Sequence, residues 1–326
     1  MSSNLVKLDK IDLQILRELD DDSSKSYAEI GRLYKIPAET VRYKIKSLVS
    51  KGVIADFFTV IDLGKLGYGV HKVMLKLHNV NEDKVTEALN FLSCNKNVNW
   101  VARFDGKFDI GFTIQVRYLR ELSEFVDILK NKYHNYISKL SFAVNIEADF
   151  LTREYLLSKK TRKSGSSKYT TPDNPASIDS IDREILQVIS SNPRAAATEI
   201  ATKTELTSET VAQRIRKLEK QKIITGYKIS LNTASIDVLN YYLLINLHYV
   251  SAERIAELIE YCRAHPSITY VIKALGEWDY EINLEVPSVR FYRDSIMELT
   301  RKFSDIIRDY EGLHVDQVHK FCILPT

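Results

Sequence analysis

Two stretches of the chain concentrate the basic side chains that can hold a nucleic-acid backbone. Residues 37–51 contain four basic residues against one acidic residue, and residues 208–222 contain five against two, so each stretch has a net charge of +3. Arginine and lysine bind phosphate oxygens, and polar side chains beside them can reach base edges. The residues of these stretches that we predict to contact DNA are Arg42, Tyr43, Lys44, Lys46, Gln213, Arg214, Arg216 and Lys217.

The apolar residues of the first stretch indicate which side chains point outward. Val41, Ile45 and Leu48 fall on one helical face and leave the opposite, basic face for solvent or a DNA groove. Lys44 and Arg214 have a second interpretation, in which they brace the helix. A charged helix face is usually only a solvated face, but the recurrence of the pattern in both stretches favours DNA contact.

A third group of residues has the composition of a metal site. His314, Asp316 and His319 lie close together in the sequence. On a strand, however, His314 and Asp316 share a face while His319 points to the other face, so we predict no metal site. No glycine-rich phosphate loop, Gly-x-Ser-x-Gly elbow or His-Glu-x-x-His motif occurs. We therefore predict no catalytic residues and no resident cofactor.

The segments that carry these residues occur twice, 170 positions apart. Asp9-Lys10-Ile11-Asp12 returns as Asp179-Ser180-Ile181-Asp182, and Gly106-Lys107-Phe108-Asp109 returns as Gly276-Glu277-Trp278-Asp279. A gap-free offset that persists across loops indicates duplication of a whole unit. Such a chain is what a dimer becomes after fusion.

Each repeat begins with three short helical segments and continues with strands of period two. The turn of three or four residues between the last two helices is typical of a helix-turn-helix, and the next strand is expected to be a wing. The order βαββαβ downstream indicates a ferredoxin-like domain whose open sheet face needs a cover. We predict an α+β fold with winged helix-turn-helix domains at residues 1–62 and 178–232 and ferredoxin-like sensor domains at residues 63–157 and 233–326.

Residues 158–177 join the repeats and are predicted to be a flexible basic linker, because they are polar and lack an apolar period. The sequence contains no run of 18 apolar residues and no secretion signal. Cys94, Cys262 and Cys322 lack the spacing of metal or disulfide sites. We expect a cytoplasmic protein without a membrane partner.

An ordered set of residues resembles the leucine-responsive/AsnC family of transcription regulators, also called feast/famine regulators. In the first repeat the set comprises Leu8-Asp9-x-x-Asp12-x-x-Ile15-Leu16, Glu29-Ile30-Gly31, Thr40-Val41-x-x-Lys44-Ile45-x-x-Leu48-x-x-x-Gly52-Val53-Ile54, Leu66-Gly67-Tyr68 and Gly106-x-x-Asp109. In the second repeat it comprises Asp179-x-x-Asp182-x-x-Ile185-Leu186, Asn192-x-Arg194, Arg214-Ile215-x-x-Leu218-Glu219 and Gly276-x-x-Asp279. Because each repeat is covered nearly end to end, the chain looks like a tandem member of that family.

The resemblance implies a DNA-binding head, to whose contacts we assign Arg194, and a sensor domain that binds an amino acid or other small metabolite near the Gly-x-x-Asp turn. The effector-binding residues implied in this way are Gly106, Asp109, Gly276 and Asp279. A turn that needs a positive φ explains the same residues without a ligand. The second repeat departs from the family pattern at Lys222, where a glycine is usual, and at Asp237-Val238-Leu239, where Leu-Gly-Tyr is missing.

The resulting hypothesis is a transcription regulator that binds double-stranded DNA and is not an enzyme. The two repeats would pair as a covalent pseudo-dimer, and pseudo-dimers are expected to associate into homo-oligomers. Two alternatives stay open. One is an enzyme similar to the sirohaem decarboxylases, which share the two-part architecture and would need residues such as His71, His248, Arg103 and Tyr270. The other is a metabolite-binding partner that does not bind DNA.

Overall fold

Each repeat has the order of helices and strands that the periodicity predicts. The computed structural model describes residues 5–157 and 167–324. The first repeat contains α1 (Lys10–Asp21), α2 (Tyr27–Tyr34), α3 (Ala38–Ser50), β1 (Ile54–Ile61), η1 (Leu63–Leu66), β2 (Gly69–Leu77), α4 (Glu82–Cys94), β3 (Val98–Asp105), β4 (Ile110–Val116), α5 (Leu119–Tyr133) and β5 (Ile137–Phe150). The second contains α6 (Ser180–Ser191), α7 (Ala197–Thr204), α8 (Ser208–Lys220), β7 (Ile224–Leu231), η3 (Thr233–Ile236), β8 (Leu239–Leu247), α9 (Ala252–Ala264), β9 (Ile268–Gly276), β10 (Tyr280–Val286), α10 (Val289–Lys302) and β11 (Ile307–Phe321). Between them lie η2 (Glu154–Leu156) and β6 (Ser167–Thr170).

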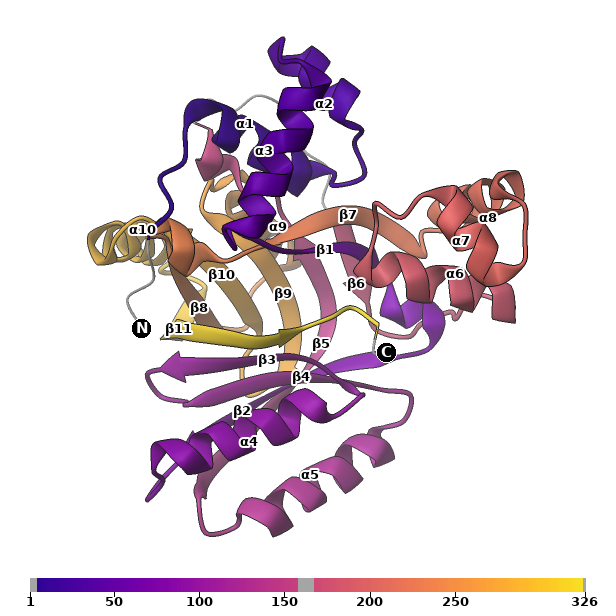
Figure 1. The fold of residues 1–326 in the computed structure, drawn as a ribbon. Coiled ribbons are helices and arrows are strands. Elements are labelled where there is room, and N and C mark those ends of the chain that lie inside the picture. Colours follow the sequence, from indigo (N-terminus) through magenta and orange to yellow (C-terminus); the bar gives the residue numbers. More distant parts are fainter. Residues whose placement is uncertain (1–4, 158–166, 325–326) are drawn as a thin grey trace.

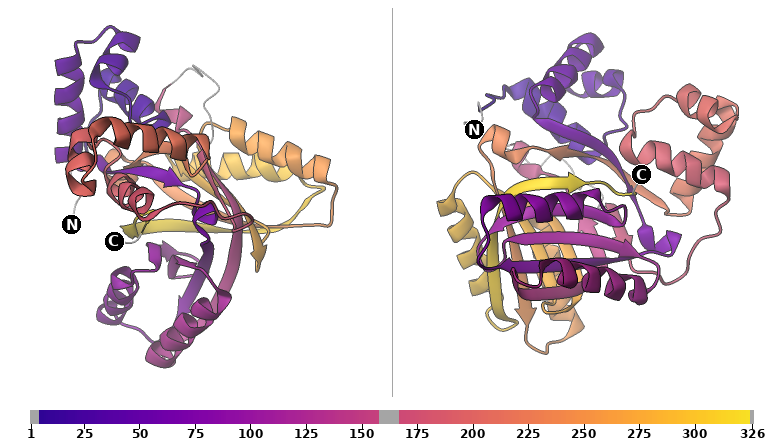
Figure 2. Two further views of the ribbon diagram at one scale, coloured as in Figure 1. Left: turned by 90° about the vertical axis from the view of Figure 1, so that its right-hand side faces the viewer. Right: turned by 60° about the horizontal axis from the view of Figure 1, so that its bottom comes forward.

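The two sensor sheets have the ferredoxin-like strand orders β5-β2-β4-β3 and β11-β8-β10-β9. As expected, their open faces look toward each other. They also join along both edges, because β3 pairs with β11 and β5 pairs with β9, so the eight strands close into one barrel. Helices α4 and α5 cover one side of the barrel, and α9 and α10 cover another (Figures 1 and 2). Closure pairs the edges of the two sensor sheets with each other, except where β5 and β11 extend beyond β2 and β8.

The barrel interior is built from side chains of both repeats. Residues of the first repeat such as Trp100 and Phe104 pack against Leu244, Trp278 and Leu313 of the second. The shared core holds the repeats together within one chain. None of the helices in the described ranges combines the length and the apolar character needed to cross a lipid bilayer.

The strand after each helix-turn-helix pairs with its counterpart from the other repeat. We call α1–α3 head 1 and α6–α8 head 2. β1 and β7 form an antiparallel two-stranded ribbon in which Phe57 lies opposite Ile229. Ile229 and Leu231 belong to the core of head 1, whereas Val60 and Ile61 belong to the core that includes head 2. Each head is therefore completed by a strand of the other repeat, and the heads lie at the two ends of the ribbon (Figure 1).

The prediction of an unstructured linker over residues 158–177 is wrong for its second part. Residues 158–166 lie outside the described part of the chain, but Ser167–Thr170 form β6, which pairs with β5 and packs beside β7. Tyr169 enters the apolar core, and its hydroxyl accepts a hydrogen bond from Asn145 Nδ2 at 2.9 Å. Four residues are too few to show a period, which is why the polar composition hid the strand.

Candidate nucleic-acid interface

The recognition helices are held in place by carboxylates at the start of each head. Asp9 caps α1 by accepting the Asp12 N–H at 2.8 Å, and Asp12 returns a bond to the Asp9 N–H. Lys44 of α3 reaches across with its Nζ 2.5 Å from Asp9 Oδ2 and 3.1 Å from Asp12 Oδ1. The hydrogen bond from Lys44 is the main reason why the pKa of Asp9 lies below its usual value.

Head 2 repeats this arrangement with arginine in place of lysine. Arg214 Nη1 lies 2.8 Å from Asp179 Oδ2 and 2.7 Å from Asp182 Oδ1. The Asp182 backbone N–H and then the Arg214 side chain keep the pKa of Asp179 low. Lys44 and Arg214 thus brace α3 and α8 against α1 and α6, which is the second of the two roles expected for them.

The other predicted residues of the recognition helices are exposed. Val41, Ile45 and Leu48 are buried as the pattern predicts, so α3 presents its basic face outward. Tyr43 is 70% exposed, although it is a large aromatic residue that burial would stabilise. The predicted residues that lie exposed on α3 and α8 are Arg42, Tyr43, Lys46, Gln213, Arg216 and Lys217. Arg42 also pairs with Glu39 at 3.1 Å, a surface pair of small energetic weight.

Arg194 lies elsewhere. Its Nη1 donates to the carbonyl oxygens of Ser23 at 2.5 Å and Lys25 at 3.0 Å, and its guanidinium stacks over the Tyr27 ring. It therefore joins head 2 to head 1 and lies between the heads rather than on the face of α8. The sequence carried no signal for this role, because the partners are main-chain oxygens of the other repeat.

The Gly-x-x-Asp turns lie where each repeat meets the other. Gly106 has a φ of +139° and Gly276 a φ of +148°, and a Cβ at Gly276 would lie 2.7 Å from the Phe142 carbonyl oxygen. Asp109 Oδ2 accepts the Leu77 N–H at 2.6 Å, and Asp279 Oδ2 accepts the Leu247 N–H at 2.7 Å. These contacts support the structural explanation of the motif, in which glycine permits the turn and aspartate secures it.

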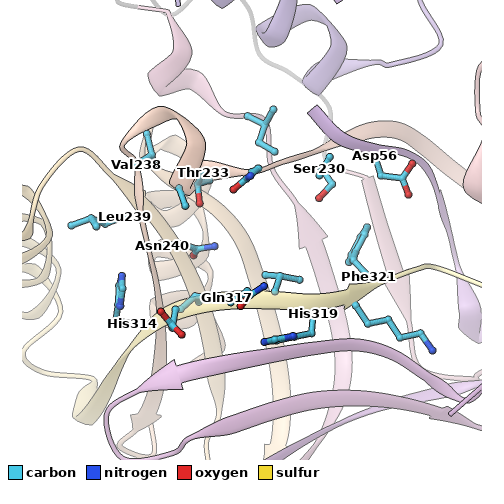
Figure 3. Close-up of a pocket in the computed structure, with 18 of the residues that line it drawn as sticks. Asp56, Ser230, Thr233, Val238, Leu239, Asn240, His314, Gln317, His319 and Phe321 are labelled. Carbon is cyan, nitrogen blue, oxygen red and sulfur yellow. The ribbon is translucent and has the colours of Figure 1, made fainter. Parts of the chain in front are cut away.

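An open cavity of about 600 Å³ separates the ribbon from the barrel. His314, Gln317, His319 and Phe321 of β11 form one wall, and Asp56 and other ribbon residues lie opposite (Figure 3). His314, Asp316 and His319 all line this cavity, although strict alternation places His319 on the other face of the strand; irregular pairing between residues 315 and 317 and between 318 and 320 interrupts the alternation. His314 Nδ1 lies 3.2 Å from Asp105 Oδ2.

A second cavity, of about 110 Å³, adjoins the first inside the barrel. Lys72 Nζ lies there 2.9 Å from Glu281 Oε1 and 3.9 Å from the centroid of the Trp100 ring. Burial lowers the pKa of Lys72, and Glu281 opposes that shift. Of the four residues considered for a decarboxylase, only Tyr270 lines either cavity. Arg103 instead pairs with Glu82 and Asp316.

Comparison with known proteins matches both heads to helix-turn-helix families. Residues 178–219 match the AsnC-type helix-turn-helix domain, and residues 8–55 match a winged helix-turn-helix DNA-binding domain. An uncharacterized HTH-type transcriptional regulator of Pyrococcus furiosus is 34% identical over 119 residues, which are 36% of this chain and 79% of that protein. The HTH-type transcriptional regulator Ptr1 of Methanocaldococcus jannaschii has the same identity and coverage. Each relative therefore corresponds to about one repeat.

Among solved structures, the siroheme decarboxylase NirDL is similar over nearly the whole chain. The TM-score is 0.63 at 15% identity, with 97% of this chain and 94% of that chain covered. At this identity the likeness concerns the fold, and it shows that a solved protein has both repeats in a comparable arrangement.

Proposed function

The chain belongs to the leucine-responsive/AsnC family of helix-turn-helix transcriptional regulators, and on that premise we propose that it binds specific sites on double-stranded DNA through both heads. The observation that carries the proposal is that some basic residues of the recognition helices are held in ion pairs within the heads while others are exposed. Lys44 and Arg214 are held by carboxylates at short distances, while Arg216 is exposed on the same helix as Arg214 and Lys217 is exposed with only a 3.9 Å pair to Asp182 Oδ2. Exposed cations on two recognition helices are what phosphate contact requires.

Binding of genomic DNA fragments at two salt concentrations tests this proposal. Replacing both Arg216 and Lys217 by alanine should weaken binding and flatten the dependence of log K on log salt by about 0.9 for each lost phosphate contact. The matched control replaces Arg290 and Arg293, two exposed basic residues of α10, by alanine. An unchanged slope in the first variant would remove α8 from the contact surface. Failure of the unaltered protein to capture fragments would favour the metabolite-binding partner.

We further propose that the repeats act as a covalent pseudo-dimer in the cytoplasm and that the sensor domains bind an amino acid or other small metabolite. The closed barrel and the shared ribbon support pairing within the chain. The proposed effector contacts remain Gly106, Asp109, Gly276 and Asp279, at the two turns between repeats. Light scattering gives the mass of the particle and therefore the extent of homo-oligomer formation, and ligand-induced thermal shifts test the effector.

The similarity to NirDL over the full chain favours one second candidate, a tetrapyrrole enzyme. NirDL has been solved in complex with an iron-uroporphyrin III analogue. The cavity of this chain is poorly suited to such a polycarboxylate, because its lining includes Asp56, Asp237 and Asp316 together with Lys320. An absorbance band from a co-purified tetrapyrrole would favour the enzyme, and a colourless protein that captures DNA would support the regulator.

A further inference from the structure

The offset of 170 residues relates the open cavity to a place in the structure that is already filled. β6 lies against residues 147–150 of β5. Their counterparts in β11 are residues 317, 318, 320 and 321, because β11 has one extra residue between Val318 and Lys320, and all four border the open cavity. We propose that this cavity docks an extended, basic peptide segment of another protein, which adds a strand to β11 as β6 adds one to β5.

The strand edges support this correspondence. One edge of β5 pairs first with β2, through residues 137–145, and then with β6, through residues 147–150. The matching edge of β11 pairs with β8 through residues 307–314, and within the described ranges no strand continues that pairing. An unpaired strand edge is a template for an incoming strand, whose main chain supplies the hydrogen bonds.

Side chains beneath β6 are buried, whereas their counterparts in β11 are exposed, as expected for one filled and one open groove. Ala148, beneath β6, is 0% exposed, whereas its counterpart Val318 is 46% exposed. Asp62 is buried beside β6, and its Oδ1 accepts hydrogen bonds from the Thr170 N–H at 2.8 Å and the Thr170 hydroxyl at 3.1 Å. Its counterpart Asn232 is exposed at the rim of the cavity. Asn232 can therefore accept the hydrogen bonds that Asp62 accepts from Thr170, but no strand of the described residues donates them.

The chain approaches both grooves along the same path. After β6, the Ala176 N–H donates to the Lys65 carbonyl oxygen at 2.7 Å. At the other groove, the counterpart Val6 N–H donates to the Ser235 carbonyl oxygen at 2.8 Å. A segment docked on β11 would therefore lie next to the N-terminal arm, in the relation that β6 has to residue 176.

The lining residues indicate the chemistry of the partner. Asp56, Asp237 and Asp316 line the cavity together with Lys320, His314 and His319. Asp316 is already paired with Arg103, so Asp56 and Asp237 are the carboxylates that favour basic side chains in the docked segment. Asp56 occupies the position of Gly226, where a Cβ would lie 1.9 Å from Ser167 Oγ, so the docked segment needs a small residue there.

Gly64, which lies beside β6, indicates how closely a docked segment can approach η3. A Cβ at Gly64 would lie 2.5 Å from the Thr170 carbonyl oxygen, and the counterpart of Gly64 is Ala234. The docked segment must therefore lie farther from η3 than β6 lies from η1. Because it would touch both the ribbon beneath head 1 and the barrel, its binding would couple a partner protein to the position of that head.

A tethered strand tests the groove itself. The extended chain carries a copy of residues 163–170, with glycine in place of Ser167, directly before residue 1. This placement keeps the offset of 170 residues between the repeats and supplies the strand at a high local concentration. The matched control carries proline at the copied position of Tyr169, because the N–H groups of Lys168 and Thr170 point away from β5, toward Thr225 and Asp62, and proline at position 169 cannot donate a main-chain hydrogen bond to the paired strand. Hydrogen exchange at amides 316–320 should be at least about tenfold slower in the extended chain than in the control. Equal exchange rates in the two chains would overturn the proposal.

A free peptide tests the partner. A labelled, capped Ser-Gly-Lys-Tyr-Thr-Lys peptide should bind the unextended protein saturably in fluorescence anisotropy. The double variant Asp56→Lys with Asp237→Lys should weaken that binding at least about tenfold, while Asp294→Lys on α10 should leave it unchanged. Absence of saturable binding, or binding that ignores the charge reversal, would refute a basic peptide as occupant. A small molecule that stays bound to both the extended chain and its proline control, detected by native mass spectrometry, would also refute a basic peptide as occupant.

Discussion

A buried charge network beneath head 1 provides the sharpest test of how the two repeats differ. Arg153, which follows β5, donates from Nε and Nη2 to Glu285 at 2.8 and 2.9 Å and from Nη1 to Asp20 at 2.5 Å. All three residues are buried. Lys228 Nζ donates to the Asp20 carbonyl oxygen at 3.0 Å, and Tyr155 donates its hydroxyl to Glu285. Burial lowers the pKa of Arg153, but Glu285 and Asp20 more than offset this effect and hold the pKa above its usual value.

The substitution Arg153→Met leaves two buried carboxylates without their main cation. Breaking a buried ion pair in this way costs about 3–5 kcal/mol of the free energy of unfolding. The assay is guanidinium unfolding followed by circular dichroism, with exchange at the amides of α1 as a local measure, since Asp20 ties α1 to the barrel. The matched variant copies the uncharged counterpart of this network in the other half of the molecule, where Leu324, Ser190 and Gln115 take the positions of Arg153, Asp20 and Glu285; one extra residue in β11 makes the offset 171 at Leu324.

That variant combines Arg153→Leu, Asp20→Ser and Glu285→Gln with Lys228→Met, which removes the remaining buried charge. Because replacing a whole buried ionic network by neutral groups is often neutral or stabilising, its free energy of unfolding should lie within about 2 kcal/mol of the unaltered chain. A loss as large as that of Arg153→Met would refute the reasoning, because it would show that the network stabilises the fold by more than its own desolvation.

Three further predictions follow from contacts described above. Arg214→Ala should lower the melting temperature of head 2 and change the salt slope of DNA binding less than the combined loss of Arg216 and Lys217, as fluorescence-monitored melting and filter binding can measure. The pKa values of Asp9 and Asp179 are lowered in the folded state, so their contribution to stability is present above about pH 4 and is lost as the pH falls through the folded values. In thermal melts between pH 5 and 2, the melting temperature of Asp179→Ala should therefore fall less steeply with pH than that of the control Asp294→Ala. Burial raises the pKa of Cys262 to about 12, so a thiol reagent at pH 8 should label exposed Cys94 in the native protein and label Cys262 only on unfolding, as peptide mass spectrometry can show.

Sequence patterns predicted the elements that depend on local periodicity. The strands of period two expected in each repeat are present, and β4, in which Ile110, Phe112 and Ile114 alternate, is buried along its whole length. The pattern Val41, Ile45 and Leu48 likewise identified the inner face of α3. Both patterns have a physical cause in the side-chain period of the element, which needs no knowledge of distant residues.

The remaining features depend on partners that lie far away in the chain. The pairing of β1 with β7 and the position of Arg194 between the heads join residues more than 130 positions apart, as does the network around Arg153. A charged residue such as Arg153 resembles a surface residue in any local window, because its partners become visible only in the folded chain. The same holds for β6, whose four residues acquire a strand conformation by pairing with β5.

The barrel interior gives a physical reason for joining two different repeats in one chain. Lys72 and Glu281 form an ion pair with side chains that are 3% and 1% exposed, and they belong to different repeats. The offset places Tyr242 at the position of Lys72 and Gly111 at the position of Glu281. A pair of first repeats would therefore bury two lysines without a carboxylate, and a pair of second repeats would bury two glutamates without a cation. Since an uncompensated buried charge costs several kcal/mol, this core favours the mixed pair over either matched pair, and the covalent link supplies the mixed pair at every copy of the chain.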